Sequence, residues 1–535
     1  MLRVVGKLKT LWTGLFFQPN EAKYFHYLQK KPVKKQDDSK TVVLIEFSRI
    51  YSNIIGLYYF LLELRAKTNA SFVAYMLYPL KPWTSLLLFK FKKIYQALGV
   101  SKFILVHPQN GMADEIDTYL KLHPIHINTT KDLEMLEFEG VWIGDIVYDS
   151  YLYKTRKPTV DVKSTELQME IREALYYYLF WKKYFSENKV QSLVVSHTVY
   201  THFAVASRLA IALNIEVFQV NDAGLYRLST EKKYAYHEFF DFKKALGQIP
   251  KDLQLLGREW AKQRLQRRFG GEVGVDMSYS PVSAWVGSSA CAEIVPSSRK
   301  KILVATHCFF DSPHPYGLNL FTDFYEWLTF LGKISERTDY DWYLKSHPGF
   351  LPGNDTVLSE LSRRFPKLKV ISATTSHPSL LSSGIDLVLT VYGTIGMEYA
   401  YHGVPVINAS PNNVHIAFDF NLHPKSIGEY EALLLSLEKL SLNIPKEQIL
   451  DYYFLKNFVF HQSWIWSSLE EMTVGIGGDN MLSTNEILNY FFKVYSPELE
   501  AKALKNAKEF LDSEAYCPMK SPEELRELLH QPKTG

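Results

Sequence analysis

The feature that most constrains the fold is a repeated alternation of short apolar, β-branched runs with helical segments. Examples of these runs are TVVLIEF, SFVAYML and VQSLVVSH in the first half of the chain, and KKILVAT, DWYLKSH and DLVLTVYG in the second. Continuous apolar runs of this length are typical of parallel strands that are buried on both faces, and parallel strands require crossover helices between them. The chain is therefore predicted to be an α/β protein.

The alternation occurs in two separate parts of the chain. Residues 41–230 and 301–425 are each expected to form a Rossmann-like domain, and the two domains are expected to face each other across a cleft. Residues 1–40 are predicted to be a basic amphipathic arm and linker, and residues 231–300 an interdomain region. Residues 426–535 are predicted to be a helical segment that returns to the first domain.

Composition excludes several classes of protein. The chain has 535 residues, 47% of them hydrophobic, and a net charge of +3, which is too small for a general nucleic-acid binder. The arginine run in REWAKQRLQRRF is interpreted as a solvated helix face, because no aromatic residues interleave it. Cys291, Cys308 and Cys517 are too widely spaced for a disulfide framework or a CxxC metal site. A reducing cytoplasm is the expected location.

Two segments have the pattern of a basic amphipathic helix. They are MLRVVGKLKTLWTGLFF at the start of the chain and PWTSLLLFKFKKIYQALGV further on. Neither approaches the roughly 18 consecutive apolar residues of a membrane span, and the first lacks the cleavage site of a signal peptide. Two interpretations stay open: docked helices with a solvated basic face, or peripheral contact with the inner face of the cell membrane.

The stretch YDWYLKSHPG ends a strand-like run in polar residues. Lys345 and Ser346 close the run, and His347 and Pro348 follow. The carboxyl ends of strands in open α/β sheets are the places where nucleotides bind. We therefore expect these residues to contact a nucleotide, the alternative being a plain loop with a solvated histidine.

A second stretch, DLVLTVYGTIGMEYAYHGVPVI, has a strand, a glycine turn and a helix. The turn contains Tyr392 and Gly393, the helix is expected to begin at Thr394, and Glu398 follows one turn later. Backbone N–H groups at such a helix start suit a phosphate, and Glu398 suits ribose hydroxyls. The alternative is an ordinary strand-turn-helix connection with a surface glutamate.

KSHPG and YGTIGMEYAYHGVPVI resemble motifs of GT-B glycosyltransferases that build bacterial capsules and other surface polysaccharides, including Kdo- and sialyltransferase-like enzymes. The resemblance covers both α/β units, weakly in the first and well in the second. It implies that His347, Pro348, Thr394 and Glu398 bind a nucleotide-sugar donor. It also implies that the first domain holds a glycan or lipid-linked glycan acceptor. CMP-, UDP- and GDP-linked sugars stay open as donors, and no metal or other cofactor is expected.

The same families often place a catalytic aspartate at a strand end in the first domain. The nearest match is QVNDAGLYRL, which offers Asp222 as general base but departs from the family pattern by an inserted alanine and an asparagine in the first acidic place. Glu46, at the end of the first strand, is the second candidate for the base. Arg49 and His197 also follow strands of this domain and are predicted to contact the acceptor.

The loop ATHCFFDSPHPYG follows the first strand of the second domain. His307 and Asp311 are predicted to bind the donor, and His314 the acceptor. Pro313 and Pro315 exclude the helix that a zinc site at these spacings would need. The DYD triplet precedes its strand rather than following it, so it is not assigned to a metal either.

Three functions remain open at this stage. The first is a metal-independent glycosyltransferase of surface polysaccharide assembly. The second is a nucleotide-sugar 2-epimerase-like enzyme on the same fold, and the third is a noncatalytic scaffold in a polysaccharide assembly complex.

Overall fold

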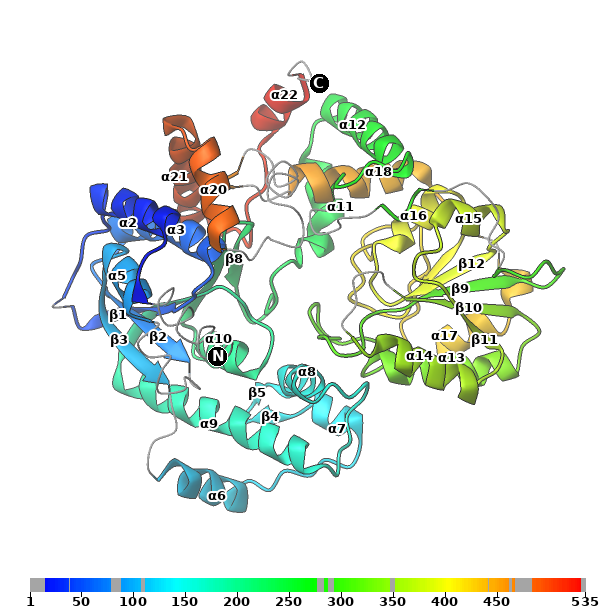
Figure 1. Ribbon diagram of the computed structural model, residues 1–535, viewed down its shortest axis with the longest axis horizontal. Coiled ribbons are helices and arrows are strands. Elements are labelled where there is room, and N and C mark those ends of the chain that lie inside the picture. The colour runs from blue at the N-terminus through cyan, green and yellow to red at the C-terminus, as the bar shows by residue number, and fades with distance from the viewer. Residues whose placement is uncertain are drawn as a thin grey trace, which may run out of the picture.

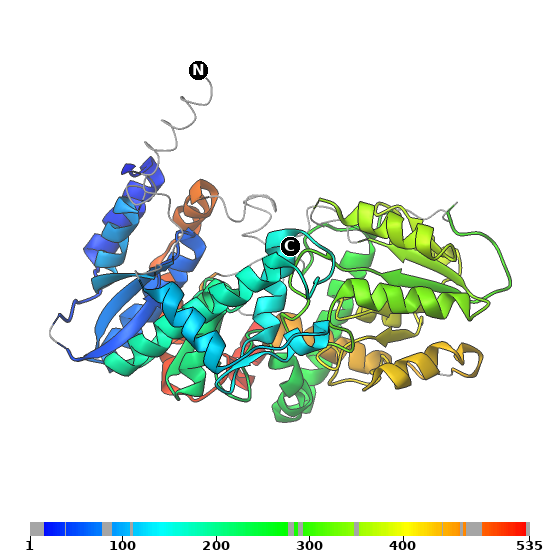
Figure 2. The ribbon, with the colours of Figure 1, turned by 90° about the horizontal axis from the view of Figure 1, so that it is seen from below.

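The computed structural model describes residues 15–37, 39–77, 88–106, 111–276, 283–286, 293–346, 352–440, 442–460, 464–466 and 484–530. Two sheets, each flanked by helices, lie side by side in the molecule (Figures 1 and 2). No helix in the described ranges is long and apolar enough to cross a membrane.

The first sheet is built by the amino-terminal part of the chain. Its strands are β1 (Thr41–Glu46), β2 (Ser71–Leu77), β3 (Val100–Val106), β6 (Lys189–Val195), β7 (Glu216–Asn221) and β8 (Gly224–Leu228). The helices around it are α2 (Pro19–Lys30), α3 (Tyr51–Lys67), α5 (Phe89–Ala97), α6 (Met112–Leu122), α7 (Thr130–Glu134), α8 (Gly144–Thr155), α9 (Thr165–Glu187) and α10 (Thr201–Ala212). A small hairpin, β4 (Glu137–Phe138) and β5 (Val141–Trp142), precedes α8.

The strand order of this sheet is β3-β2-β1-β6-β7-β8, and all the pairings are parallel except that of β7 with β8. The order reverses between β1 and β6, as in a doubly wound fold. The QVNDAGLYRL stretch is a hairpin, in which Asn221 pairs with Gly224 and Asp222 lies in the turn between them. Its antiparallel strand β8 closes one edge of an otherwise parallel sheet.

A helical connection links the two sheets. It contains the short 3-10 helix η1 (Glu238–Asp241), α11 (Phe242–Gln248) and α12 (Lys251–Phe269). The arginine run predicted to be a solvated face lies on α12, where Arg258, Arg264, Arg267 and Arg268 each pair with a carboxylate. The prediction was wrong for Arg268, which is buried, because α12 packs its last turn against the second domain.

The second sheet contains β9 (Lys301–Ala305), β10 (Asp341–Lys345), β11 (Leu368–Ile371), β12 (Leu387–Thr390) and β13 (Val406–Asn408). Its helices are α13 (Phe324–Glu336), α14 (Asn354–Arg364), α15 (His377–Ser382), α16 (Ile395–Tyr401) and α17 (Ile427–Leu434). The order β11-β10-β9-β12-β13 is entirely parallel and reverses between β9 and β12. Figure 1 shows α13, α14 and α17 on one side of the sheet and α15 and α16 on the other.

The predicted fold class, an α/β protein with two Rossmann-like domains and a helical C-terminal segment, is confirmed by these two sheets.

Capping residues mark where several of the helices begin. Ser164, Asp323 and Ser496 each cap a helix by accepting a hydrogen bond from a backbone N–H of the first turn.

The C-terminal segment returns to the first domain, as predicted. It contains η2 (Leu437–Lys439), α18 (Lys446–Phe454), η3 (Leu455–Val459), α20 (Thr484–Val494), α21 (Pro497–Asp512) and α22 (Pro522–His530). α18 and α22 pack on α12, whereas α20 and α21 lie beside α3 (Figure 1). Trp464 and Trp466 fix this return, because their indole N–H groups donate to Asn221 O and Asp222 Oδ2 at 2.8 and 3.0 Å.

The second basic amphipathic segment is described only from Leu88 onwards. Its first cation, Lys90, is buried and pairs with the buried Glu21 of α2 at 2.8 Å, so it does not belong to a solvated face. Lys93 and Phe89 remain exposed on α5. The first amphipathic segment lies mostly outside the described residues.

Candidate functional site

A cavity of about 320 Å³ opens at the carboxyl ends of β9 and β12. These are the two strands between which the order of the second sheet reverses, and ligands of open α/β sheets bind in the crevice at such a point. Its lining residues are Arg268, Glu272, Val273, Gly274, Val275, Ser283, Ala284, Trp285, Ala305, Thr306, His307, Tyr316, Lys345, Ser346, His377, Thr390, Tyr392, Gly393, Thr394, Ile395 and Glu398.

Most of the residues predicted to bind a donor meet in this cavity. The loops after β9, β10 and β12 bring together Lys345, Ser346, His307, Tyr392, Gly393, Thr394 and Glu398. His347 and Pro348 lie outside the described residues, and Asp311 is not among the residues that line the cavity. The fold brings these residues together although they are far apart in the sequence. Their roles in donor binding stay predictions.

Lys345 gives the cavity a positive charge on a rigid element. It is the last residue of β10 and is 4% exposed, and its ammonium group donates to Ala373 O at 2.5 Å. Ser346 follows it and is equally buried. A buried cation held at a strand end suits an anionic ligand such as a phosphate.

The turn after β12 is held by the histidine that follows β9. His307 Nε2 lies 3.2 Å from Thr390 Oγ1 and accepts from the Val391 N–H at 3.3 Å. Thr390 Oγ1 also accepts from the Gly393 N–H, so that amide is satisfied within the chain. Fewer backbone N–H groups are therefore available to a phosphate than the sequence predicts. In addition, α16 has only seven residues, and some N–H groups of its first turn are already bonded within the chain.

Glu398 is the acidic group of the cavity. It is 4% exposed, and its two carboxylate oxygens accept separately from Arg268 Nη2 and from Trp285 Nε1, the latter at 3.2 Å. Burial opposes ionisation, but the charges of Arg268 and His377 outweigh it and hold the pKa of Glu398 below its usual value. An ionised, oriented carboxylate with remaining lone pairs can accept hydrogen bonds from hydroxyl groups.

Sequence reasoning missed Arg268, Trp285 and His377. His377 begins α15, and its Nδ1 lies 3.1 Å from Tyr399 Oη. The available signal was a second Ser-His-Pro triplet, residues 376–378, which repeats the triplet at 346–348. Trp285 stacks against the His402 ring, and the only signal for Arg268 was its place in a basic run.

The two candidate bases lie in the first domain, away from this lining. Asp222 is 7% exposed and accepts from Trp466 Nε1 at 3.0 Å. Glu46 is 6% exposed and accepts from the N–H and the Oγ–H of Ser196, both at 2.8 Å. Burial raises the pKa of both carboxyl groups. Their role as general base stays a prediction.

The residues predicted to contact an acceptor are not brought together. Arg49 is exposed in the loop after β1, and His197 is exposed after β6. Asp311, predicted to bind the donor, instead accepts from the Tyr200 hydroxyl of the first domain at 2.8 Å.

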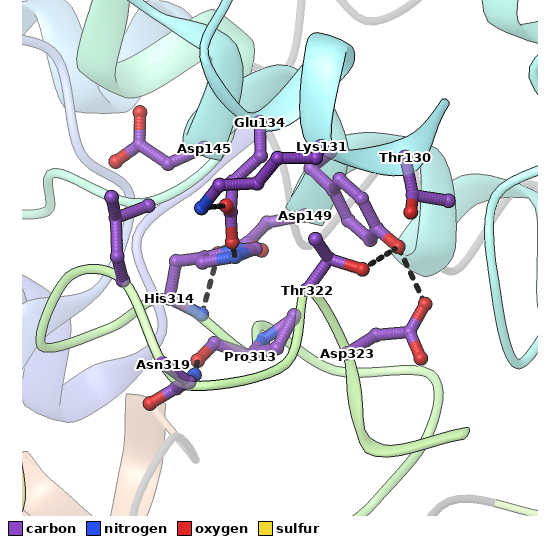
Figure 3. A network of polar contacts seen from close by, with 12 residues as sticks. Thr130, Lys131, Glu134, Asp145, Asp149, Pro313, His314, Asn319, Thr322 and Asp323 are labelled. Atoms are coloured by element: carbon purple, nitrogen blue, oxygen red, sulfur yellow. Dashed lines mark hydrogen bonds and ion pairs between the residues drawn. The ribbon is translucent and has the colours of Figure 1, made fainter. Parts of the chain in front are cut away.

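His314 takes part in a buried contact between the domains. Its Nδ1 lies 2.6 Å from Asp149 Oδ1 and its Nε2 lies 3.0 Å from Glu134 Oε1 (Figure 3). Its side chain is 0% exposed, so neither ring nitrogen is open to an acceptor in this conformation. Burial opposes protonation, but the two carboxylates outweigh it and raise the pKa of His314 to about 10.

Two aspartates of α8 form buried ion pairs with other elements. Asp149 lies within α8 and pairs with His314, and Asp145 pairs with the buried Arg208. Tyr148 donates to Asp323 Oδ2 at 2.5 Å, which links α8 to the start of α13. In the described ranges, no three His, Cys, Asp or Glu side chains are grouped as a metal site requires.

Comparisons with known proteins identify no family for this chain. No family model matches the chain, and no curated protein matches it.

The similar solved structures include an epimerase, a polymerase and a glycosyltransferase. The UDP-GlcNAc 2-epimerase from Neisseria meningitidis bound to UDP-GlcNAc is 11% identical, with a TM-score of 0.22 over 77% of this chain and 95% of that one. The wall teichoic acid polymerase TagF is 11% identical, with a TM-score of 0.20 over 92% of this chain and 98% of that one. A glycosyltransferase from Rickettsia africae is 12% identical, with a TM-score of 0.25 over 86% of this chain and 100% of that one.

Proposed function

We propose that this protein is a metal-independent GT-B-type glycosyltransferase. It moves a sugar from a nucleotide-sugar donor, bound in the cavity of the second domain, to a growing or lipid-linked surface glycan such as a capsule polysaccharide. The observation that carries the proposal is the cavity at the β9 and β12 strand ends, where residues far apart in sequence supply groups suited to the phosphate and the ribose of a nucleotide.

The charges in the cavity fit such a ligand. Lys345 supplies a buried cation for a phosphate, and the ionised Glu398 supplies an acceptor for ribose hydroxyls. Arg268 neutralises Glu398, so the carboxylate does not repel an anionic ligand. When the donor's bond to its sugar breaks, negative charge grows on the departing phosphate, and a fixed cation stabilises that charge.

The first experiment is a nucleotide screen by thermal shift with CMP, UDP and GDP. At least one of them should raise the melting temperature of the full chain, because a ligand that binds only the folded state stabilises it. Replacing the buried cation, Lys345→Met, should abolish most of this shift. The matched control is Lys333→Met, which removes an exposed lysine of α13 in the same domain and should keep the shift.

The products of the reaction then distinguish a glycosyltransferase from an epimerase. Release of free nucleotide that depends on an added glycan acceptor indicates transfer, whereas conversion of UDP-GlcNAc without an acceptor indicates an epimerase. A chain that no nucleotide stabilises would contradict the proposal and leave the scaffold function.

We further propose that the first domain contacts the membrane surface through α2, α5 and the linker between α2 and β1. Lys23 and Lys30 of α2, Lys34 of the linker and Lys93 of α5 are exposed, and Phe89 beside Lys93 is 53% exposed. Exposed cations next to an exposed aromatic ring favour an anionic lipid surface.

Vesicle sedimentation tests this contact. The protein should bind phosphatidylglycerol vesicles more strongly than phosphatidylcholine vesicles, and Lys93→Glu should weaken that binding by about fivefold or more. Lys333→Glu makes the same charge reversal on the second domain and should have no effect. Equal sedimentation of the two variants would reject this surface.

A further inference from the structure

Five aromatic rings lie together on the first domain, where β6 ends and α10 begins. Tyr153 comes from the last turn of α8 and is 42% exposed, His197 is exposed, and Tyr200, His202 and Phe203 are half-buried. Neighbouring rings are in contact, with centroids 4.8 Å apart for Tyr153 and Tyr200 and 4.0 Å apart for His202 and Phe203. We call this group of five residues the aromatic shelf.

The shelf is held on rigid elements. Thr201, the first residue of α10, donates from its N–H to Ser150 Oγ of α8 at 2.7 Å and from its hydroxyl to Glu170 of α9 at 2.7 Å. Three helices therefore fix the positions of the rings. Large aromatic surface left open on a rigid support is typical of a binding surface rather than of a packing defect.

Tyr200 is held in a strained backbone conformation. Its φ is 68° and its ψ is 151°, a region that is essentially restricted to glycine. The hydroxyl of Tyr200 donates to the carboxylate of Asp311 in the second domain at 2.8 Å. Strain of this kind persists where the surrounding structure enforces it, and it is concentrated at functional sites.

The shelf lies next to the cavity of the second domain. Asp311 is followed by Ser312, whose carbonyl accepts from the hydroxyl of Tyr392 at 3.2 Å, and Tyr392 lines the cavity. One short loop thus separates the shelf from the proposed donor site. Glu46, a candidate base, is bonded to Ser196, which directly precedes His197.

We propose that the aromatic shelf binds a pyranose ring of the glycan acceptor. The proposal rests on the proposed glycosyltransferase function and adds the acceptor site to it. The apolar C–H face of a pyranose packs on aromatic rings, while its hydroxyls need polar groups at the edge of the ring stack. The Asp311 carboxylate and the imidazole of His197 supply that edge.

The protonation of His197 suits this role. Dense surrounding protein lowers its pKa, against the smaller effect of Asp311, so the imidazole is neutral at neutral pH and offers one donor and one acceptor nitrogen. The pKa of His202 is lowered to about 4 by burial, Lys154 and His197. The shelf therefore presents uncharged rings with the Asp311 carboxylate at its edge, which suits a neutral sugar better than a phosphate.

The test is saturation-transfer NMR on the full chain, without nucleotide. The probes are the methyl glycosides of glucose, galactose, mannose and N-acetylglucosamine. We expect transfer to at least one of them, strongest at the protons of the C–H face. Tyr153→Ala and Tyr200→Gly should each weaken its affinity by about fivefold, as expected for losing one stacked ring. Glycine adopts the Tyr200 backbone conformation without strain, so this variant removes the ring and keeps the fold.

The matched control is Phe240→Ala, which removes a ring of η1 that is also 42% exposed and should leave sugar affinity unchanged. No transfer with any glycoside, or equal affinity of all the variants, would overturn the proposal. The nucleotide thermal shift is measured on the same samples. Nucleotide stabilisation without sugar binding refutes the shelf alone, whereas shelf-dependent sugar binding without nucleotide stabilisation supports the shelf and refutes the donor site.

Discussion

Two adjacent arginines at the end of α12 show how much a single side chain depends on its surroundings. Arg267 pairs with Glu272, and both side chains are almost half exposed, 45% and 44%. Arg268 pairs with Glu398, and those side chains are 10% and 5% exposed. An exposed pair is screened by water, whereas breaking a buried pair leaves an uncompensated charge.

Arg268→Leu should therefore destabilise the protein by about 3 kcal/mol at pH 7. The pKa of its partner, Glu398, is lowered from the usual 4.5 in the folded protein. The stabilisation from the pair is therefore present above pH 4.5 and is lost as the pH falls through the pKa of Glu398 in the folded state. The difference from wild type in urea unfolding should accordingly shrink on acidification. The control, Arg267→Leu, should cost less than about 0.5 kcal/mol, and equal costs for the two variants would contradict this account.

At the scale of elements, the first domain depends on the close approach of α3 to the β7–β8 hairpin. A Cβ atom added at Gly56 of α3 would lie 2.6 Å from the Asn221 carbonyl carbon and 2.8 Å from the Asp222 N atom. Both are backbone atoms and cannot move aside as a side chain could. The glycine therefore sets the position of the turn that carries Asp222.

Gly56→Ala should cost about 2 kcal/mol or more through this clash, although alanine is the better helix former. Gly428→Ala in α17 is the matched control, because the nearest atom to its added Cβ is Ser426 Oγ at 3.9 Å. It should stabilise the protein by about 0.5 to 1 kcal/mol. Thermal melting of the two variants checks the predicted loss and the predicted gain of stability. A Gly56→Ala variant as stable as wild type would exclude the tight contact.

For the whole molecule, the contact around His314 joins the two domains. Glu134 and Asp149 come from the first domain and His314 from the second, and all three are buried. Removing the imidazole would leave two carboxylates facing each other away from water. The domain contact therefore depends on the charge of one histidine.

His314→Gln should cost about 3 to 5 kcal/mol at neutral pH. Because the folded pKa is raised from 6.5 to about 10, the stabilisation is fully present below pH 6.5, falls as the pH rises, and is absent above about pH 10. Comparing the unfolding of wild type and variant at pH 6, 8 and 10 measures this. The control is His26→Gln on the exposed face of α2. A difference from wild type that stays constant with pH would contradict the charge assignment.

The sequence by itself determined most of the strands, the parallel arrangement of both sheets apart from β8, and seven of the residues that line the cavity. The central strands, such as β1 and β9, are continuous apolar runs, and burial on both faces leaves such a run little alternative to a central parallel strand. The sequence could assign Lys345 and Glu398 to one site, because the carboxyl ends of parallel strands lie at the same edge of a sheet. The hairpin at Asp222 was not anticipated, because a turn between antiparallel strands and a strand end in a parallel sheet have similar local sequences.

Only the tertiary structure decided which charged groups meet. Arg268 and Glu398 are 130 residues apart, and His314 is 165 residues from Asp149. Nothing in the local sequence around these residues shows which ion pairs will form or whether they will be buried. The aromatic shelf is likewise assembled from the end of α8 and the start of α10. Long-range packing sets the burial of these groups, and burial sets their charge, their pKa and what they can bind.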